Sequence, residues 1–223
     1  MKILNLYAGI GGNRKLWGND HEITAVEYDA GIASIYKNLY PNDTVIVADA
    51  HRYLLDHFKE FDFIWSSPPC PTHSKLVTLN YSINDLLSYP DMSLYQEVII
   101  LQHFFKGKYC IENVMGYYKP LIHPQESGRH YFWANFKIPN IKVDGLPIKG
   151  ETGLNIKERE VYAGYNDFEY KEFKGDKTKI FKNMVSPEIG LAIFESALNI
   201  YNHNKVEQVG LFALPSPPVN KQD

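Results

Sequence analysis

Several features that point to particular classes of protein are scarce in this chain of 223 residues. Only two cysteines are present, Cys70 and Cys110. They are too few for a disulfide framework or for a zinc site built from several thiolates. Because cysteines are scarce, a reducing compartment is expected, which indicates a cytoplasmic protein. Because no set of thiolate ligands is present, we expect no bound metal.

Long hydrophobic runs are also missing. The first residues, MKILNLYAGIGG, begin with a short apolar stretch, but glycines follow where a signal peptide would continue with a longer one. A membrane-spanning helix would need about 20 apolar residues. We therefore expect neither a signal peptide nor contact with a membrane.

The chain has no overall excess of positive charge, since its formal net charge is −3. The composition as a whole therefore does not indicate a nucleic-acid-binding protein. Lysines do gather in YKEFKGDKTKIFKN, and Lys177 and Lys179 are candidates for contacts to phosphate groups. A solvated, lysine-rich loop is the alternative interpretation.

The order of the hydrophobic segments predicts an α/β fold. Short β-rich runs alternate with segments whose apolar residues recur at helical spacing, which is typical of a mostly parallel sheet with helices on both faces. Ser186 is the expected N-cap of the last helix, and Pro187 its first residue. We expect strands at 2–9, 22–29, 43–49, 61–67, 108–114 and 129–138, helices at 30–41, 93–107 and 186–204, and a further helix that opens at 13–18.

A glycine-rich turn, YAGIGG, follows the first expected strand. Its glycines allow a sharp turn and a close approach of the backbone to a ligand. Glu27 ends the second strand and Asp49 the third, where carboxylates can bind a ribose and an adenine. A tight turn with solvent-facing acids is the alternative. No Gly-Lys-Ser/Thr follows, which excludes a P-loop, whereas a nicotinamide cofactor stays open on this loop alone.

One cysteine is held in a stiff segment, WSSPPCPTHS, after the fourth expected strand. Pro69 and Pro71 restrict the backbone on both sides of Cys70. Rigid backbone is useful around a nucleophile, so Cys70 is a candidate for one. A proline-rich turn that holds an inert, buried cysteine is the alternative. A nucleophile without any sign of hydride chemistry favours S-adenosylmethionine as the cofactor.

In their order along the chain, these segments and three others resemble the motifs of the DNA cytosine-5 methyltransferase family. The resemblance covers roughly residues 3–200 and implies a Rossmann-like, S-adenosylmethionine-dependent methyltransferase fold. It also implies double-stranded DNA as substrate and S-adenosyl-L-homocysteine as product. The matching segments are LNLYAGIGG, AVEYD, VADA, SSPPCPTHS, IENV, GRHYFWANF and FKNMVSPEIGLAIFESAL.

The resemblance assigns roles to the matching residues. Cys70 would add to carbon 6 of a flipped cytosine while Glu112 protonates, or bonds to, ring nitrogen 3. The implied catalytic residues are Cys70, Glu112, Asn113 and Arg129, with His73 and Ser74 against the DNA backbone or, alternatively, as a surface polar pair. The implied cofactor-binding residues are Tyr7, Ala8, Gly9, Gly11, Gly12, Glu27, Tyr28, Asp49, Ala50, Pro68, Asn183 and Val185.

The chain departs from the family pattern in three places. Tyr7 stands where phenylalanine is usual, and the Arg-x-Arg pattern is broken because His130 and Tyr131 follow Arg129. Only about two dozen residues separate WANF from KEREVYAGYNDFEY, too few for a conventional target recognition domain. We therefore expect one catalytic domain at 1–204 with a minimal recognition insert near 137–156 and a short or relaxed target site. The compact form resembles stand-alone methyltransferases of bacteriophages, which implies the cytoplasm of a bacterium or of a phage-infected host cell.

The segment 205–223 is expected to be a flexible tail. Its sequence EQVGLFALP places Gln208, Leu211 and Phe212 as in the pentapeptide that binds the bacterial sliding clamp. A Leu-Phe pair that docks on its own domain is the alternative.

Three other functions stay open on the sequence. The first is methylation of tRNA, since the family also has a tRNA-methylating branch. The second is a non-catalytic protein that binds DNA or the clamp. The third is a nicotinamide oxidoreductase.

Overall fold

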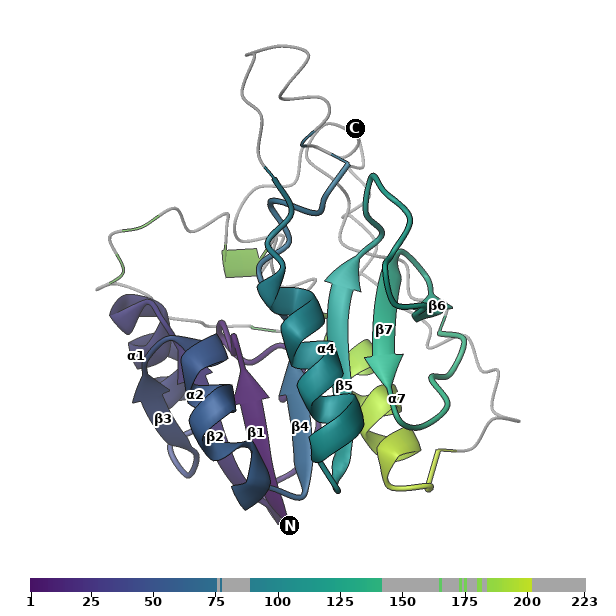
Figure 1. The fold of residues 1–223 in the computed structure, drawn as a ribbon. Helices are drawn as coiled ribbons and strands as arrows, with labels where there is room; N and C mark the ends of the chain where they lie inside the picture. Colours follow the sequence, from purple (N-terminus) through teal and green to yellow (C-terminus); the bar gives the residue numbers. More distant parts are fainter. Residues whose placement is uncertain are drawn as a thin grey trace, which may run out of the picture.

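The computed structural model describes residues 1–75, 77, 89–141, 165, 173, 175, 180–181 and 184–201. Within them a seven-stranded sheet has the order β3-β2-β1-β4-β5-β7-β6 (Figure 1). The strands are β1 (Lys2–Leu6), β2 (Glu22–Glu27), β3 (Thr44–Val47), β4 (Phe63–Ser66), β5 (Lys108–Val114), β6 (Gln125–Ser127) and β7 (His130–Ala134). The helices are α1 (Ala30–Leu39), α2 (Ala50–His57), the short 3₁₀ helix η1 (Phe58–Glu60), α4 (Ser93–Phe104) and α7 (Pro187–Ala197).

The predicted, mostly parallel sheet is confirmed. Strands β1 to β5 pair in parallel, whereas β7 runs antiparallel to both β5 and β6. The carboxyl ends of β1 to β5 and the amino end of β7 therefore lie at one edge of the sheet. In open α/β sheets this edge is where ligands bind.

Helices cover both faces of the sheet, as the sequence predicts (Figure 1). Because side chains alternate along a strand, neighbouring residues belong to opposite layers. Leu4 and Ile64 lie in the core layer that α2 and α4 cover, and Ile3 and Phe63 lie in the layer that α7 covers. Helix α1 packs on the same face of the sheet as α7, and its residue Tyr36 lies in one buried cluster with Ala25 of β2.

The helix predicted to open at 13–18 is absent, so that prediction is wrong. The segment forms turns in which Arg14 N donates to Gly11 O at 3.1 Å and Trp17 N to Arg14 O at 3.0 Å. Both side chains are almost fully buried, and Trp17 Nε1 donates to Gly190 O at 3.1 Å. These tertiary contacts outweigh the local helical preference, which contributes little per residue.

The start of α7 agrees with the prediction in part. Ser186 occupies the N-cap position and Pro187 the first turn. The Ser186 hydroxyl, however, donates to the Glu188 carboxylate and does not cap the backbone. The predicted domain limit at 204/205, the tail and most of the predicted insert lie outside the described residues. None of the described helices has the length and apolarity to cross a membrane.

Candidate active site

The glycine-rich loop leaves β1 at the carboxyl edge in a left-handed conformation. Tyr7, Gly9 and Gly11 have φ angles of 54°, 55° and 78°. A Cβ added at Gly9 would meet no atom within 4 Å, whereas one added at Gly12 would overlap Met184. The loop is therefore open on one side and closely packed on the other, and the open side can receive a ligand against the backbone.

Glu27, at the end of β2, is hydrogen-bonded to this loop. Its two carboxylate oxygens accept hydrogen bonds from Gly9 N and Asp29 N, each at 2.9 Å. Each oxygen has a further lone pair, so Glu27 can also accept from ribose hydroxyls. Next to it, Tyr28 exposes 78% of its surface and offers an aromatic face. Asp49 N-caps α2 by accepting from Arg52 N at 2.8 Å, a role that the sequence analysis did not assign.

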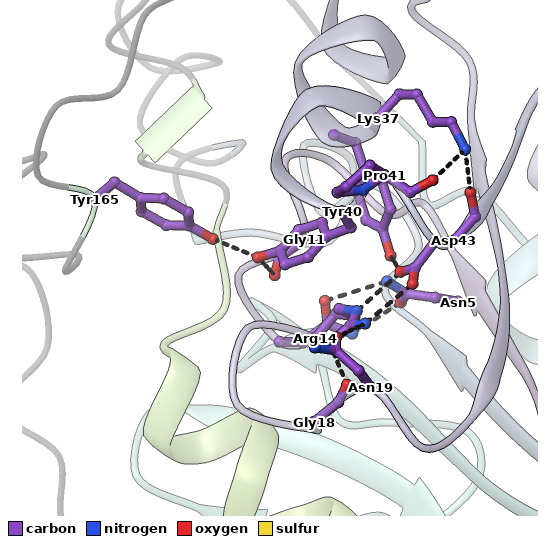
Figure 2. Close-up of polar contacts among 12 residues, drawn as sticks. Asn5, Gly11, Arg14, Gly18, Asn19, Lys37, Tyr40, Pro41, Asp43 and Tyr165 are labelled. Carbon is purple, nitrogen blue, oxygen red and sulfur yellow. Dashed lines mark hydrogen bonds and ion pairs between the residues drawn. The ribbon is translucent and has the colours of Figure 1, made fainter.

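A buried ion pair supports the loop from below (Figure 2). Arg14 donates to both oxygens of Asp43 at 2.8 and 3.0 Å, and the two side chains are only 3% and 2% exposed. Tyr36 OH donates to the same carboxylate at 2.8 Å. Tyr40 stacks beside Arg14 and donates from its hydroxyl to Gly11 O at 2.9 Å. This network links the loop to α1 through Tyr36 and Tyr40.

A second buried carboxylate, Glu97 of α4, holds the beginning of the loop. It accepts hydrogen bonds from Tyr7 OH and Ser66 Oγ, both at 2.7 Å, and pairs with His51 Nδ1 at 3.0 Å. Tyr7 stands where the resemblance leads us to expect phenylalanine, and its additional hydroxyl makes the hydrogen bond to Glu97. The sequence analysis missed Glu97 because its partners lie 31 to 90 residues away in the chain.

Cys70 lies in a turn that follows β4 at the same edge. The turn closes where Cys70 O accepts hydrogen bonds from His73 N at 3.0 Å and Ser74 N at 2.9 Å. The thiol residue is half-buried and free of any disulfide. Burial raises the pKa of Cys70, and the nearby Glu112 carboxyl raises it further. The other cysteine, Cys110, is fully buried in β5, as expected of a core residue.

Glu112 projects from β5 towards this turn and is only 7% exposed. Burial raises its pKa, while His130, with Nε2 3.7 Å from Oε1, and a hydrogen bond from Ser67 oppose that rise. A carboxyl of this kind keeps its proton to a higher pH than an ordinary glutamate does. The site therefore brings a thiol and a proton-donating group together at the ends of β4 and β5.

Asn113 connects β5 to the segment that precedes Cys70. Its Nδ2 donates to Pro68 O at 3.0 Å, and its Oδ1 accepts from Val114 N at 2.9 Å. The proline-rich segment is thereby tied to β5. The orienting role that the resemblance implies for Asn113 stays a prediction.

The remaining predicted residues lie in varied surroundings. Arg129 is exposed, and its backbone carbonyl accepts from Met115 N at 3.2 Å, while His130, the next residue, faces Glu112. His73 is buried, and Ser74 pairs with Gly116 through a β-bridge. Ala8 and Ala50 are buried beside the loop, and Val185 packs in the layer of α7. Asn183, Lys177, Lys179, Gln208, Leu211 and Phe212 lie outside the described residues.

These residues fit S-adenosylmethionine. The open backbone at Gly9, the Glu27 carboxylate and the exposed Tyr28 ring form a cradle for a nucleoside, and Cys70 lies at the same edge. In the described parts of the chain, no three His, Cys, Asp or Glu side chains gather as a metal site. The sheet order and this site define a Rossmann-like, S-adenosylmethionine-dependent methyltransferase fold.

The family follows from the match to known sequences. The model of the family described as C-5 cytosine-specific DNA methylase matches residues 1–120, more than half of the chain. The protein belongs to this family, which implies S-adenosylmethionine as its cofactor. None of the curated proteins matches the chain.

Similar solved structures include three methyltransferase-fold proteins. A triple mutant of DNMT2 from Spodoptera frugiperda is 28% identical, with a TM-score of 0.38, over 52% of this chain and 36% of its own. The methyltransferase EhMeth of Entamoeba histolytica is 14% identical, with a TM-score of 0.34, over 51% and 38%. A TehB-like methyltransferase of Corynebacterium glutamicum is 16% identical, with a TM-score of 0.35, over 54% and 58%. The chain thus spans only about a third of the DNMT2 chain.

Proposed function

We propose that this protein methylates carbon 5 of cytosine in double-stranded DNA through a covalent adduct with Cys70. The observation that supports the proposal is the meeting of Cys70 and Glu112 at the carboxyl edge, next to an open loop that fits the cofactor. Because the target carbon lies inside the base stack, the cytosine would be flipped out of the duplex to reach both side chains.

The reaction needs carbon 5 to become nucleophilic. The Cys70 sulfur adds to carbon 6, its proton passes to solvent, and Glu112 gives its proton to ring nitrogen 3 as the ring electrons shift. The cofactor supplies an electrophilic methyl group. Carbon 5, made nucleophilic by the Cys70 adduct, would receive this methyl group, with S-adenosyl-L-homocysteine as the leaving group. Loss of the carbon 5 proton to water then expels the Cys70 thiolate, and nitrogen 3 returns its proton to Glu112.

The raised pKa values of Glu112 and Cys70 suit different steps of this reaction. A Glu112 that is still protonated can act as the acid when the base enters. Cys70 is held as a neutral thiol in the free protein near neutral pH, because burial raises its pKa. The thiol would therefore lose its proton only when the base is bound and the adduct forms.

The test is transfer of labelled methyl groups from S-adenosylmethionine to unmethylated DNA, with Cys70→Ala beside the wild type. Label in DNA that falls by at least roughly 10³-fold in the variant would support the proposal, and base-resolution mapping of 5-methylcytosine would give the target site. A parallel reaction with tRNA separates the two substrates. Label in tRNA alone would replace DNA by RNA as the substrate, and no label in either would refute the proposal.

The tail motif supports a separate interaction with the bacterial sliding clamp, on its sequence alone. Replacement of Leu211 and Phe212 by alanine is expected to abolish co-purification with the clamp while methyl transfer stays unchanged. Unchanged co-purification would refute the interaction.

A further inference from the structure

We infer that His73 is a positioning residue for Cys70. His73 anchors the Cys70 turn on Tyr118 and makes no contact to the DNA backbone. The inference rests on the proposed role of Cys70 as nucleophile. It corrects the simplest reading of the sequence, in which His73 is a polar surface residue three positions after the cysteine.

The first argument is the direction of the His73 side chain. His73 is only 3% exposed, and its Nδ1 lies 2.6 Å from Tyr118 OH. Burial lowers the pKa of His73, against an opposing effect of Asp91, so the ring is uncharged at neutral pH. A buried, neutral ring is a poor partner for a phosphate group, which attracts exposed cations.

The second argument is that Tyr118, the partner of His73, is itself held by a hydrogen bond. Tyr95 OH donates to Tyr118 OH at 3.3 Å, which leaves the proton of Tyr118 for His73 Nδ1. Tyr95 belongs to α4 and is 4% exposed, and its hydroxyl accepts from Leu121 N at 3.2 Å. His73 therefore reaches α4, an element of the core, through two tyrosine hydroxyls.

The third argument is the coupling of His73 to Cys70 through the backbone. His73 N and Ser74 N donate to Cys70 O, and His73 O accepts from Tyr117 N at 3.1 Å. Ser74 adds a β-bridge to Gly116. A shift of His73 would therefore displace Cys70. A displacement of about 1 Å can lower a rate by roughly 10²-fold.

The fourth argument is the pocket next to His73. A pocket there is lined by the rings of His73, Tyr95, Tyr118 and Trp133 and by Asn113, which holds Pro68. Removal of the imidazole would enlarge this pocket, and the turn would lose its support on this side. Asn113 and His73 therefore line the same pocket.

The test compares four variants. His73→Leu and Tyr118→Phe each remove the hydrogen bond, and His73→Asn can still bond to Tyr118 because its amide reaches the position of Nδ1. Tyr117→Phe is the matched control, since it removes a neighbouring, partly exposed hydroxyl for which the described residues provide no hydrogen bond. The measurements are kcat, the Kd for DNA at several salt concentrations, and the rate at which iodoacetamide alkylates Cys70.

The first two variants are expected to lower kcat by roughly 10- to 100-fold at unchanged DNA Kd and salt dependence. His73→Asn should recover most of the loss, and Tyr117→Phe should match the wild type. If His73→Leu instead weakens DNA binding with a shallower salt dependence, and kcat at saturating DNA is kept, His73 is a phosphate contact and the inference is wrong.

Alkylation separates this inference from the proposed function, because it needs no substrate. A loosened turn should expose the half-buried Cys70 and raise its alkylation rate at least threefold in His73→Leu and Tyr118→Phe, whereas the fully buried Cys110 reacts slowly. Equal rates in the wild type and both variants would overturn the inference, even if methyl transfer occurs. If the wild type transfers no methyl while the alkylation rates differ as expected, only the proposed function fails.

Discussion

The two halves of the carboxyl edge are held together in different ways. On the cofactor side, the loop with three left-handed residues rests on the buried Arg14–Asp43 ion pair. On the nucleophile side, prolines restrict the Cys70 turn, and neutral groups such as His73, Tyr118 and Asn113 anchor it. A loop with positive φ angles is thus held by a buried, charged network, whereas a turn that prolines already restrict is held by a few neutral hydrogen bonds.

The difference also matters for the chemistry. A cation next to Cys70 would lower the pKa of the thiol. Here the charged support, Arg14, lies under the cofactor loop, and the carboxyl of Glu112 raises the pKa of Cys70. The Cys70 thiol of the free protein is therefore uncharged near neutral pH. If the two halves are independent, a substitution in one of them should leave the other unchanged.

Replacement of Glu112 by glutamine should affect the nucleophile side alone. The loss of the proton donor is expected to lower kcat by roughly 10²- to 10⁴-fold, while the Kd for S-adenosylmethionine stays within about twofold. Steady-state kinetics and calorimetry would measure the two quantities. An equally large loss of cofactor affinity would show that the halves are not separate.

Replacement of Arg14 by methionine should destabilise the cofactor side and with it the fold. It leaves Asp43 buried without its partner, which is expected to cost about 3–5 kcal/mol of the free energy of unfolding, or roughly 6–20 °C in Tm. Thermal unfolding would measure the change. The double variant Arg14→Met/Asp43→Leu should recover most of the stability, and a double variant no more stable than the single one would contradict the ion pair's role.

Replacement of Glu27 by glutamine should weaken the cofactor without altering the nucleophile. The carboxylate bonds that it makes to the loop and would make to the ribose contribute about 1.5–3 kcal/mol, so the Kd for S-adenosylmethionine should rise roughly 10- to 100-fold. Glu22→Gln, at the exposed start of the same strand, is the matched control. If both variants bind the cofactor like the wild type, Glu27 does not hold it.

The smallest expected effect is on the pH dependence of Cys70 alkylation. Because the thiolate is the reactive form, a raised pKa means that the rate keeps rising above pH 9.0, the ordinary value. Glu112→Gln removes the negative charge that contributes to this shift, so the midpoint should move to lower pH. The alkylation rate of the free protein between pH 7 and 10 measures it, and an unmoved midpoint would mean that burial alone causes the shift.

The amount that could be predicted from the sequence differs between the levels of structure. The strands around Leu4, Ile64 and Cys110 were predictable because short apolar runs bounded by turns carry a local signal. That Glu27, Cys70 and Glu112 lie at the same edge of the sheet was also predictable, since parallel strands end at one edge. The turns that replace the helix expected at 13–18 were not predictable, because the buried contacts of Arg14 and Trp17 decided that segment.

Local patterns of apolar residues, glycines and prolines were therefore sufficient to predict the main strands and the edge of the sheet at which Glu27, Cys70 and Glu112 lie, whereas the catalytic roles of these residues stay a prediction. Four contacts became visible only in the folded chain: Arg14 pairs with Asp43, Tyr7 donates to Glu97, His130 lies 3.7 Å from Glu112, and His73 lies against Tyr118. Burial and hydrogen bonding depend on partners from distant parts of the chain, which no local pattern reveals.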